Sequence, residues 1–494
     1  MKRRFLHILL LGVITFLHSY SQNYEDIAEC LNDKSLPLIN IEVNINDMSK
    51  DTYSLGKITI TQLVKNGEIK TESYNCLLRY RGMTAAFWEK KSFAVKLIDD
   101  DGEKLNASLL DLRSDNSWIL DAAAIDPLRL RNRVCFDLWG KISKTPWDTE
   151  FGNRNGTIGR PVEVFVNGSY NGIYCLSDKI NRKLLNLRKA KQNDDGSMTV
   201  KGLLYKGTNK TASNTLLTYD DMPTDSLVWN SFELQYPDEN PSLGSWQPLM
   251  DLIDFNGTTT KEEFAAHYNE WYYIDNIIDY WVFIVALNIY DMPYKNTFLS
   301  TPDINFGHRY LITPWDMDAA LGIYYNGHYL NQPTNISQLN RFAPFGRLIT
   351  NDIDSIKKRI ALRWFELTEN QLHPDSIKAQ FEVYTIQLVE SGAWAREYQR
   401  WKNNPVALKS NIDVELNYAI NWYRNNLSYI SGTMSNWCID DWSDVINAAT
   451  VTRLYNYILN GETDDINKLD FNEDGYINAA DVTVVYNIIL GIGN

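Results

Sequence analysis

The sequence has few of the residues on which thiol and imidazole chemistry depends. Its 494 residues include only five cysteines and six histidines. The cysteines show no C-x-x-C spacing, so a thiolate zinc site is not favoured, and their odd number leaves at least one thiol free or paired with another chain. No Ser-His or Cys-His constellation stands out, which disfavours a hydrolase of the triad type.

Positive charge is also scarce. The formal net charge is −14 at pH 7. An acidic chain of this kind argues against nucleic acid as a partner and fits metal-binding loops and an exported surface. Hydrophobic residues make up 44% of the chain, which over this length predicts a globular protein of two or three parts.

Long apolar runs are lacking except at the N-terminus. There, Lys2 to Arg4 precede an apolar stretch of thirteen residues from Phe5 to Leu17, and small residues at positions 19 and 21 follow. This pattern predicts a signal peptide over residues 1–21. The run is short for a bilayer span, so no transmembrane segment is expected after signal removal. We therefore expect a secreted, periplasmic or cell-surface protein.

Residues 279–322 concentrate acids and an amide at the ends of apolar segments. An apolar run is closed by Asp291, Asn296 follows five residues later, and Asp316 and Asp318 stand in PWDMD. A short hairpin-like excursion would deliver these groups to one place, as a metal–phosphate site requires. A core helix with a polar end, or carboxylates at a helix N-terminus, would show the same local pattern. Both interpretations remain open at this point.

Basic residues gather in a segment between two predicted strands. Arg79, Arg81, Lys90 and Lys91 precede or lie in a loop, and Lys96 lies on the following strand. Such a cluster would grip an anion such as a polyphosphate, or would be an ordinary solvated hairpin tip.

The rest of the chain to residue 432 predicts an α+β domain. Residues 22–75 alternate as strands do, and an Asn167-Gly168 turn predicts a hairpin. A helix is expected from Pro127, with Asp126 as its cap, and another after Lys179. Residues 345–430 show apolar residues at three- and four-residue spacing, which predicts a helical cap.

The C-terminal tail is an internal duplication. Residues 446–461 and 477–492 are identical at ten of sixteen positions. The segment before the second copy places oxygen ligands at the alternating positions of a calcium loop, with Gly475 at its sharp turn. The predicted Ca²⁺ ligands are Asp470, Asn472, Asp474, Tyr476 (through its carbonyl) and Asp481. In the first copy Ile439 and Thr450 replace the first and last ligands, so tight calcium binding is not expected there.

Two calcium-loop–helix units in tandem resemble a type I dockerin. The resemblance assigns residues 433–494 to a small all-α calcium-loop domain. It implies docking to a cohesin module on a scaffold, or to the cell surface.

The preceding domain, residues 22–432, resembles the CotH family of spore-coat-type secretory kinases. Its blocks appear in the family's order and include RYRGMTAAFWEKKSFAVKL, LDAAAIDPLRLRNRV, LLYKG and PWDMDAALG. The resemblance implies an atypical protein-kinase-like fold that transfers phosphate from ATP to an acceptor protein.

Phosphoryl transfer needs a base for the incoming hydroxyl, oxygen ligands for Mg²⁺ or Mn²⁺, and cations for the phosphates. Asp291 is the candidate base. Asn296 and Asp316 are the candidate metal ligands, supported by Asp318. The candidate phosphate ligands are Arg81, Lys90, Lys91, Arg131 and Lys179.

Three functions remain open from the sequence. The first is an exported kinase acting on Ser or Thr hydroxyls. The second is a surface adhesin or scaffold-docked protein that keeps the kinase-like fold without catalysis. The third, a component of a polysaccharide-degrading assembly, depends on the dockerin-like tail alone, because no suitable pair of carboxylates for glycoside cleavage is evident.

Overall fold

The structure is a computed structural model of the full chain. It describes residues 23–29, 31–82, 85–148, 152–194, 198–209, 211, 213–238, 241–438, 448–460, 469–472 and 475–490. The predicted signal peptide and the predicted ligand Asp474 lie outside the described residues.

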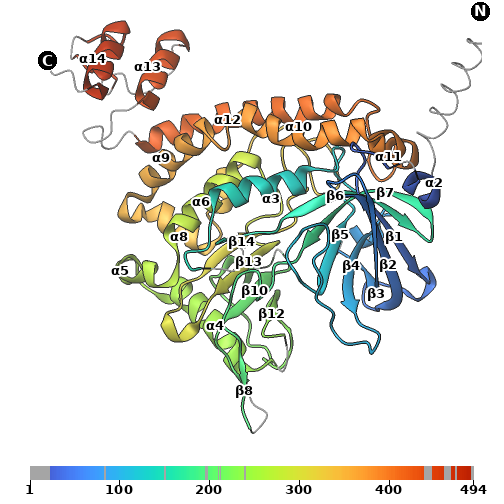
Figure 1. The fold of residues 1–494 in the computed structure, drawn as a ribbon. Helices are drawn as coiled ribbons and strands as arrows, with labels where there is room; N and C mark the ends of the chain where they lie inside the picture. The colour runs from blue at the N-terminus through green and yellow to red at the C-terminus, as the bar shows by residue number, and fades with distance from the viewer. Residues whose placement is uncertain are drawn as a thin grey trace, which may run out of the picture.

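Residues 38–178 contribute the strands of a closed barrel, which occupies the right-hand side of Figure 1. The strand order is β1-β2-β3-β4-β5-β7-β6, and the parallel pairing of β1 with β6 closes it. The strands are β1 (Leu38–Val43), β2 (Ser54–Leu63), β3 (Ile69–Arg81), β4 (Ser92–Ile98), β5 (Ser117–Asp121), β6 (Gly159–Val166) and β7 (Ser169–Asp178). Alternate residues such as Ile39, Ile41, Ile58 and Ile60 fill the interior, as the period of two in their segments predicts.

The predicted hairpin at Asn167-Gly168 is confirmed. Both residues have positive φ, 50° and 79°, and they join β6 to β7. Two consecutive left-handed residues give the turn whose twist matches the flanking strands.

Two helix predictions around the barrel are wrong, one in its start and one in its existence. Helix α3 (Arg131–Ile142) begins four residues after Pro127, because the Asp126 carboxylate accepts bonds from the amides of Leu128, Leu130 and Arg131 at 2.9, 2.7 and 2.7 Å. The residues between carboxylate and helix therefore form a turn. The helix expected after Lys179 does not form, since the chain makes turns from residue 182 to residue 186 and stays irregular up to β8.

A second sheet of five strands lies beside the barrel, in the order β11-β12-β10-β13-β14. Its strands are β10 (Leu203–Gly207), β11 (Val228–Trp229), β12 (Phe232–Tyr236), β13 (Thr297–Thr301) and β14 (Leu311–Pro314). A small ribbon of β8 (Lys191–Gln192) and β9 (Met198–Thr199) projects below it (Figure 1). Helices α4 (Leu243–Thr258), α5 (Lys261–Trp271) and α6 (Ile274–Leu287) connect β12 to β13, and α6 is buried over nearly its whole length.

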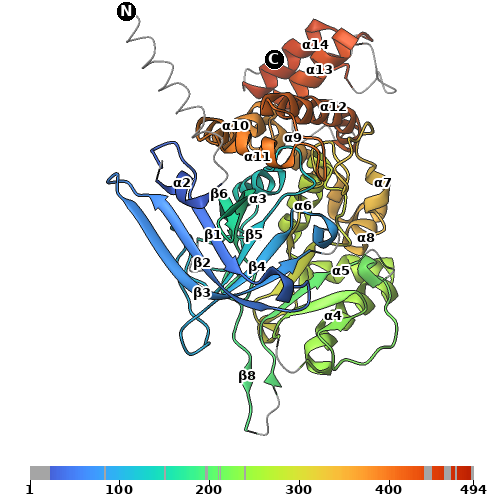
Figure 2. The ribbon, with the colours of Figure 1, turned by 90° about the vertical axis from the view of Figure 1, so that its right-hand side faces the viewer.

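The predicted helical cap is confirmed. It contains α8 (Ala343–Asn351), α9 (Ile356–Glu369), α10 (Pro374–Glu390), α11 (Ala393–Trp401) and α12 (Ile412–Cys438). Figures 1 and 2 both show α10 and α12 running across the top of the molecule, over α3 and α6. Short helices α2 (Tyr24–Ala28) and α7 (Ile336–Leu339) complete the main body. Strands and helices in these proportions confirm the α+β class.

The tail contributes α13 (Ala448–Asn460) and α14 (Ala479–Ile489), which pack on each other around a small core of their own. Val451 and Leu454 in the first copy correspond to Val482 and Val485 in the second, and all four are buried. Among the described helices, none combines the length and the apolar character needed to cross a membrane.

Candidate nucleotide and metal site

The hairpin β13–β14 brings Asn296 and Asp316 together. Thr297 pairs with Pro314 at its open end, and the Trp315 amide donates to the Asn296 carbonyl oxygen at 2.8 Å. Asn296 and Asp316 both adopt left-handed backbone conformations, with φ of 60° and 58°. Such conformations are uncommon outside glycine and concentrate at functional sites. The excursion expected from the sequence is therefore a real hairpin, and no helix begins at Asp316 or Asp318.

Asp291 reaches the same region from the end of α6. The Tyr290 amide donates to the Ala319 carbonyl at 3.0 Å, and the Leu321 amide donates to the Leu287 carbonyl at 2.8 Å. These bonds tie the segment after α6 to the loop that follows β14. The Asp291 carboxylate forms an ion pair with Lys295, one helical turn later, at 3.2 Å.

Burial and neighbouring negative charge disfavour the ionised forms of the two carboxyl groups in the loop after β14, Asp316 and Asp318. Asp316 and Asp318 are half-buried. Burial raises the pKa of Asp316, and the charge of Asp121 adds to this, whereas Arg81, Lys206 and Lys295 oppose it. Burial raises the pKa of Asp318 well above its usual range, and the negative charge of Asp316 adds to this. In the part of the chain that the structure describes, neither carboxylate has a hydrogen bond or an ion pair, so a bound cation would relieve their repulsion.

The donor set fits a divalent cation that arrives with phosphate groups. The Asn296 side chain is 5% exposed and makes no hydrogen bond within the described residues. Over the same ranges, no cluster of three or more His, Cys, Asp or Glu side chains is placed to hold a metal ion. Mg²⁺ is commonly held by one or two carboxylates together with substrate phosphates and water. Asp316, Asp318 and the Asn296 amide oxygen would supply the protein's share.

Arg81 and Lys179, among the predicted phosphate ligands, lie near this site. The Arg81 guanidinium, at the end of β3, sits over the Trp315 ring at 5.4 Å, and its charge acts on Asp316. Lys179 is exposed just after β7. Together with burial, the positive charges of both residues lower the pKa of Lys206.

Lys206 itself belongs to the site and was not predicted. It stands on β10 after Leu203, Leu204 and Tyr205, which are fully buried. Burial lowers the pKa of Lys206 to about 8, and Arg81 contributes, while Glu233 and Asp316 oppose it. A lysine inside an otherwise apolar strand was the available sequence signal, because such a residue rarely enters a core without a partner.

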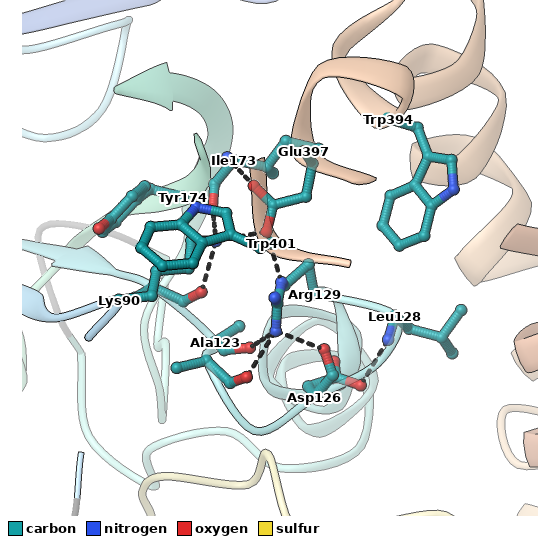
Figure 3. A network of polar contacts seen from close by, with 12 residues as sticks. Lys90, Ala123, Asp126, Leu128, Arg129, Ile173, Tyr174, Trp394, Glu397 and Trp401 are labelled. Carbon is teal, nitrogen blue, oxygen red and sulfur yellow. Dashed lines mark hydrogen bonds and ion pairs between the residues drawn. The ribbon is translucent and has the colours of Figure 1, made fainter. Parts of the chain in front are cut away.

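Lys90 lies elsewhere, in a buried network shown in Figure 3. Its ammonium group donates to the carbonyls of Ala122 and Ile173 at 3.0 and 2.6 Å, and to Glu397 at 2.9 Å. Glu397, on α11, also accepts from Arg129 at 2.7 Å and from the Ile173 amide at 2.7 Å. Burial lowers the pKa of Lys90 to about 7. The side chain is fully enclosed, so its contacts join the barrel to the helical cap and do not fit a phosphate-binding role.

Arg131 and Lys91 also have other partners. Arg131 is fully buried and bonds Asp126 at 2.5 Å and Glu415, on α12, at 2.9 Å. Lys91 donates to the carbonyls of Ala86 and Trp88 at 2.7 and 3.0 Å, which closes the loop before β4. Of the five predicted cations, the structure therefore brings Arg81 to the carboxylates, while the charge of Lys179 acts on the neighbouring Lys206.

The described part of the predicted calcium loop is organised around two of its acids. The Gly475 amide donates to Asp470 at 2.6 Å, and Gly475 has a φ of 86°. Asp481 is fully buried and accepts from the amides of Phe471, Asn472 and Asn478 at 2.7, 3.2 and 2.8 Å. The Tyr476 side chain is exposed, so the contribution expected of this residue is its backbone carbonyl.

In a comparison with protein families, residues 78–430 match the family described as CotH kinase protein. The matched region contains all the candidate residues of the nucleotide and metal site and ends before the tail. No curated protein matches the chain.

Proposed function

The chain belongs to the CotH kinase family, and from that premise we propose that it is an exported kinase that phosphorylates Ser or Thr side chains of an acceptor protein. Membership implies a kinase-like protein that uses ATP, a divalent metal ion and a protein substrate. The observation that carries the finer proposal is the hairpin that joins Asn296 to Asp316 beside Asp291.

In this proposal Asp291 is the general base. Its carboxylate accepts the proton of the acceptor hydroxyl as the hydroxyl oxygen bonds to the γ-phosphorus and the bond from the γ-phosphorus to the β–γ bridging oxygen breaks, which releases ADP. The ion pair with Lys295 holds the carboxylate in a fixed position. Orientation and charge stabilisation supply most of the remaining rate in phosphoryl transfer.

The other candidate residues would bind the metal ion and offset the negative charge of the ATP phosphates. Asn296, Asp316 and Asp318 would hold Mg²⁺ or Mn²⁺, which when bound offsets the charge that develops on the phosphates. Arg81 and Lys206 lie close enough for their charges to act on Asp316, and they would contact the phosphates from the barrel side and the sheet side. Lys179 would add a third positive charge at the rim.

The experiment is a transfer assay with labelled ATP. The purified mature protein is incubated with Mg²⁺ or Mn²⁺ and a generic Ser/Thr-rich acceptor, beside the variant Asp316→Ala. The proposal is supported if label appears in the acceptor or in the protein itself and is absent with Asp316→Ala. Absence of both labelling and nucleotide binding in the unmodified protein would refute it and favour the adhesin alternative.

We also propose that the chain is exported and that residues 433–494 dock it, with Ca²⁺ bound, to a cohesin module or a surface scaffold. The support is the signal-peptide pattern, the calcium-loop pattern and the exposure of apolar side chains at equivalent positions of the two tail repeats. Tyr455, Ile458 and Leu459 are exposed on α13. The residues 31 positions later are also exposed: Tyr486 and Ile489 on α14, and Leu490 directly after it. Exposed apolar side chains at equivalent positions of both copies are typical of a docking surface.

A further inference from the structure

Asn132 links the barrel to the loop that carries the two candidate metal carboxylates. It lies on α3, and its Oδ1 accepts a hydrogen bond from the Met317 amide at 2.9 Å. Its Nδ2 donates to Asp121 Oδ2, at the end of β5, at 2.7 Å. Met317 stands between Asp316 and Asp318 and is fully buried. This hydrogen bond therefore holds the peptide unit between Asp316 and Met317, directly between the two carboxylate-bearing residues.

Asp121 is itself held in place from the barrel. Its Oδ1 accepts from the Ala123 amide at 3.1 Å and from the Ser92 hydroxyl at 3.3 Å. The Ser92 hydroxyl in turn accepts from the Ala122 amide at 2.9 Å. Ser92 opens β4, directly after the loop that follows Arg81. The hydrogen bonds thus run without interruption from the start of β4, through β5 and α3, to the carboxylate loop.

The chemistry of an amide suits this position. Asn132 must accept from an N–H on one side and donate to a carboxylate on the other, and an amide side chain does both while remaining neutral. A carboxylate in its place would still accept from Met317, but it would put a second negative charge against Asp121. A hydrocarbon side chain would leave both partners unsatisfied in a half-buried setting.

We propose that Asn132 is a positioning residue that sets the carboxylate loop for metal and nucleotide and couples it to the loop before β4. This deepens the proposed function and depends on it for the identity of the ligand. The hydrogen-bonded geometry itself stands apart from catalysis, so the two ideas can fail separately.

The test uses Asn132→Asp and the double variant Asp121→Asn with Asn132→Asp in the full chain. The double variant exchanges the amide and the carboxylate between the two positions. The amide on β5 then donates to the carboxylate on α3, and that carboxylate accepts from the Met317 amide, which restores the chain of bonds. Two readouts are taken: hydrogen exchange of the peptide covering residues 315–321, and Mn²⁺ binding followed by electron paramagnetic resonance with a non-hydrolysable ATP analogue present.

Asn132→Asp should raise the exchange rate of residues 315–321 and weaken Mn²⁺ binding, each by about tenfold. The variant loses the hydrogen bond to Asp121 and places two carboxylates against each other, and a lost buried hydrogen bond has a cost of this size. The double variant should recover both. A single variant that matches the unmodified protein in either readout, or a double variant no better than the single one, would overturn the inference. If Asn132→Asp does not fold, the double variant must fold and match the unmodified protein. Absence of Mn²⁺–nucleotide binding in the unmodified protein would count against the proposed function, while the exchange rates would still decide whether Asn132 holds the loop.

Discussion

The amide of Trp315 donates to the carbonyl oxygen of Asn296 at 2.8 Å, so residues at the two ends of one hairpin meet. Asn296 itself and Asp316, the residue after Trp315, both adopt left-handed backbone conformations. The spacing of Asp291, Asn296 and Asp316 along the chain does not by itself create the site. The register of β13 with β14 does, because a shift of one residue would send the same side chains to the opposite face.

Asp291→Asn should abolish transfer and leave nucleotide binding intact. A general base contributes about 10²- to 10⁴-fold to the rate, and an amide cannot accept the proton. Single-turnover labelling measures the transfer, and calorimetry with an ATP analogue measures binding. Asp275→Asn is the matched control, because Asp275 is exposed and lies at the other end of α6. An Asp291→Asn enzyme that transfers phosphate at the normal rate would remove Asp291 from this role.

Glu397→Gln should destabilise the fold without changing the affinity for ATP. The substitution leaves Lys90 and Arg129 buried without their shared anion. Breaking a buried ion pair from one side costs about 3–5 kcal/mol. Urea unfolding measures the loss, and the KM for ATP should stay constant. The opposite pattern, a raised KM with unchanged stability, would return Lys90 to the nucleotide site.

Asp279 should give the protein a pH-dependent stability. Burial raises the pKa of this carboxyl to about 6. Arg363, whose Nε lies 2.7 Å from the Asp279 Oδ1, acts in the opposite direction and lowers the pKa. Because the folded state binds the proton more tightly than the unfolded chain, the contribution of Asp279 is greatest below about pH 4 and declines as the pH rises to about 6. A shift of this size corresponds to about 3 kcal/mol. Unfolding free energies of the unmodified protein and of Asp279→Asn, measured from pH 4 to pH 7, should therefore diverge by about that amount, in favour of the variant at the higher pH. Parallel curves would contradict the prediction.

Calcium should bind to the tail at one site. Asp470→Ala removes the first ligand, so the calcium-induced rise in the melting temperature of the tail should disappear. Asp441→Ala, at the equivalent of the third loop position in the first copy, should leave it unchanged. Calorimetric titration of Ca²⁺ into the full chain gives the stoichiometry. Equal titrations for Asp470→Ala and the unmodified protein would show that the loop has been misassigned.

Local patterns sufficed for the α+β class, the Asn167-Gly168 turn, the helical cap and the excursion between Asn296 and Asp316. They failed for the cations. In the sequence Lys90 and Arg131 look no different from Arg81, but their partners, Glu397 and Glu415, lie more than 280 residues away along the chain. Lys206 was missed for the converse reason, since only the packing of β10 beside β13 brings it near Asp316.

The start of α3 depends on a similar tertiary effect. Asp126 takes three backbone amides and also the Arg131 guanidinium, so the segment expected as the first helical turn is held as an open turn. The Asp-Pro pair is a valid helix-start signal. Here the buried Asp126 carboxylate accepts more hydrogen bonds than a helix cap requires, and Leu128 and Leu130, which donate two of them, lie before the helix.

The most direct test of the metal–nucleotide site is a calorimetric titration of an ATP analogue into the unmodified protein and into Asp316→Asn, each with and without Mn²⁺. Binding by the unmodified protein should require the metal ion. Asp316→Asn should weaken nucleotide binding in the presence of Mn²⁺ by about tenfold to a hundredfold or more. Removal of a residue that only supports a metal ligand already lowers metal affinity by about that factor. Nucleotide binding that needs no metal, or that is equal in the two proteins, would contradict the assignment of Asp316 and of the site built around it.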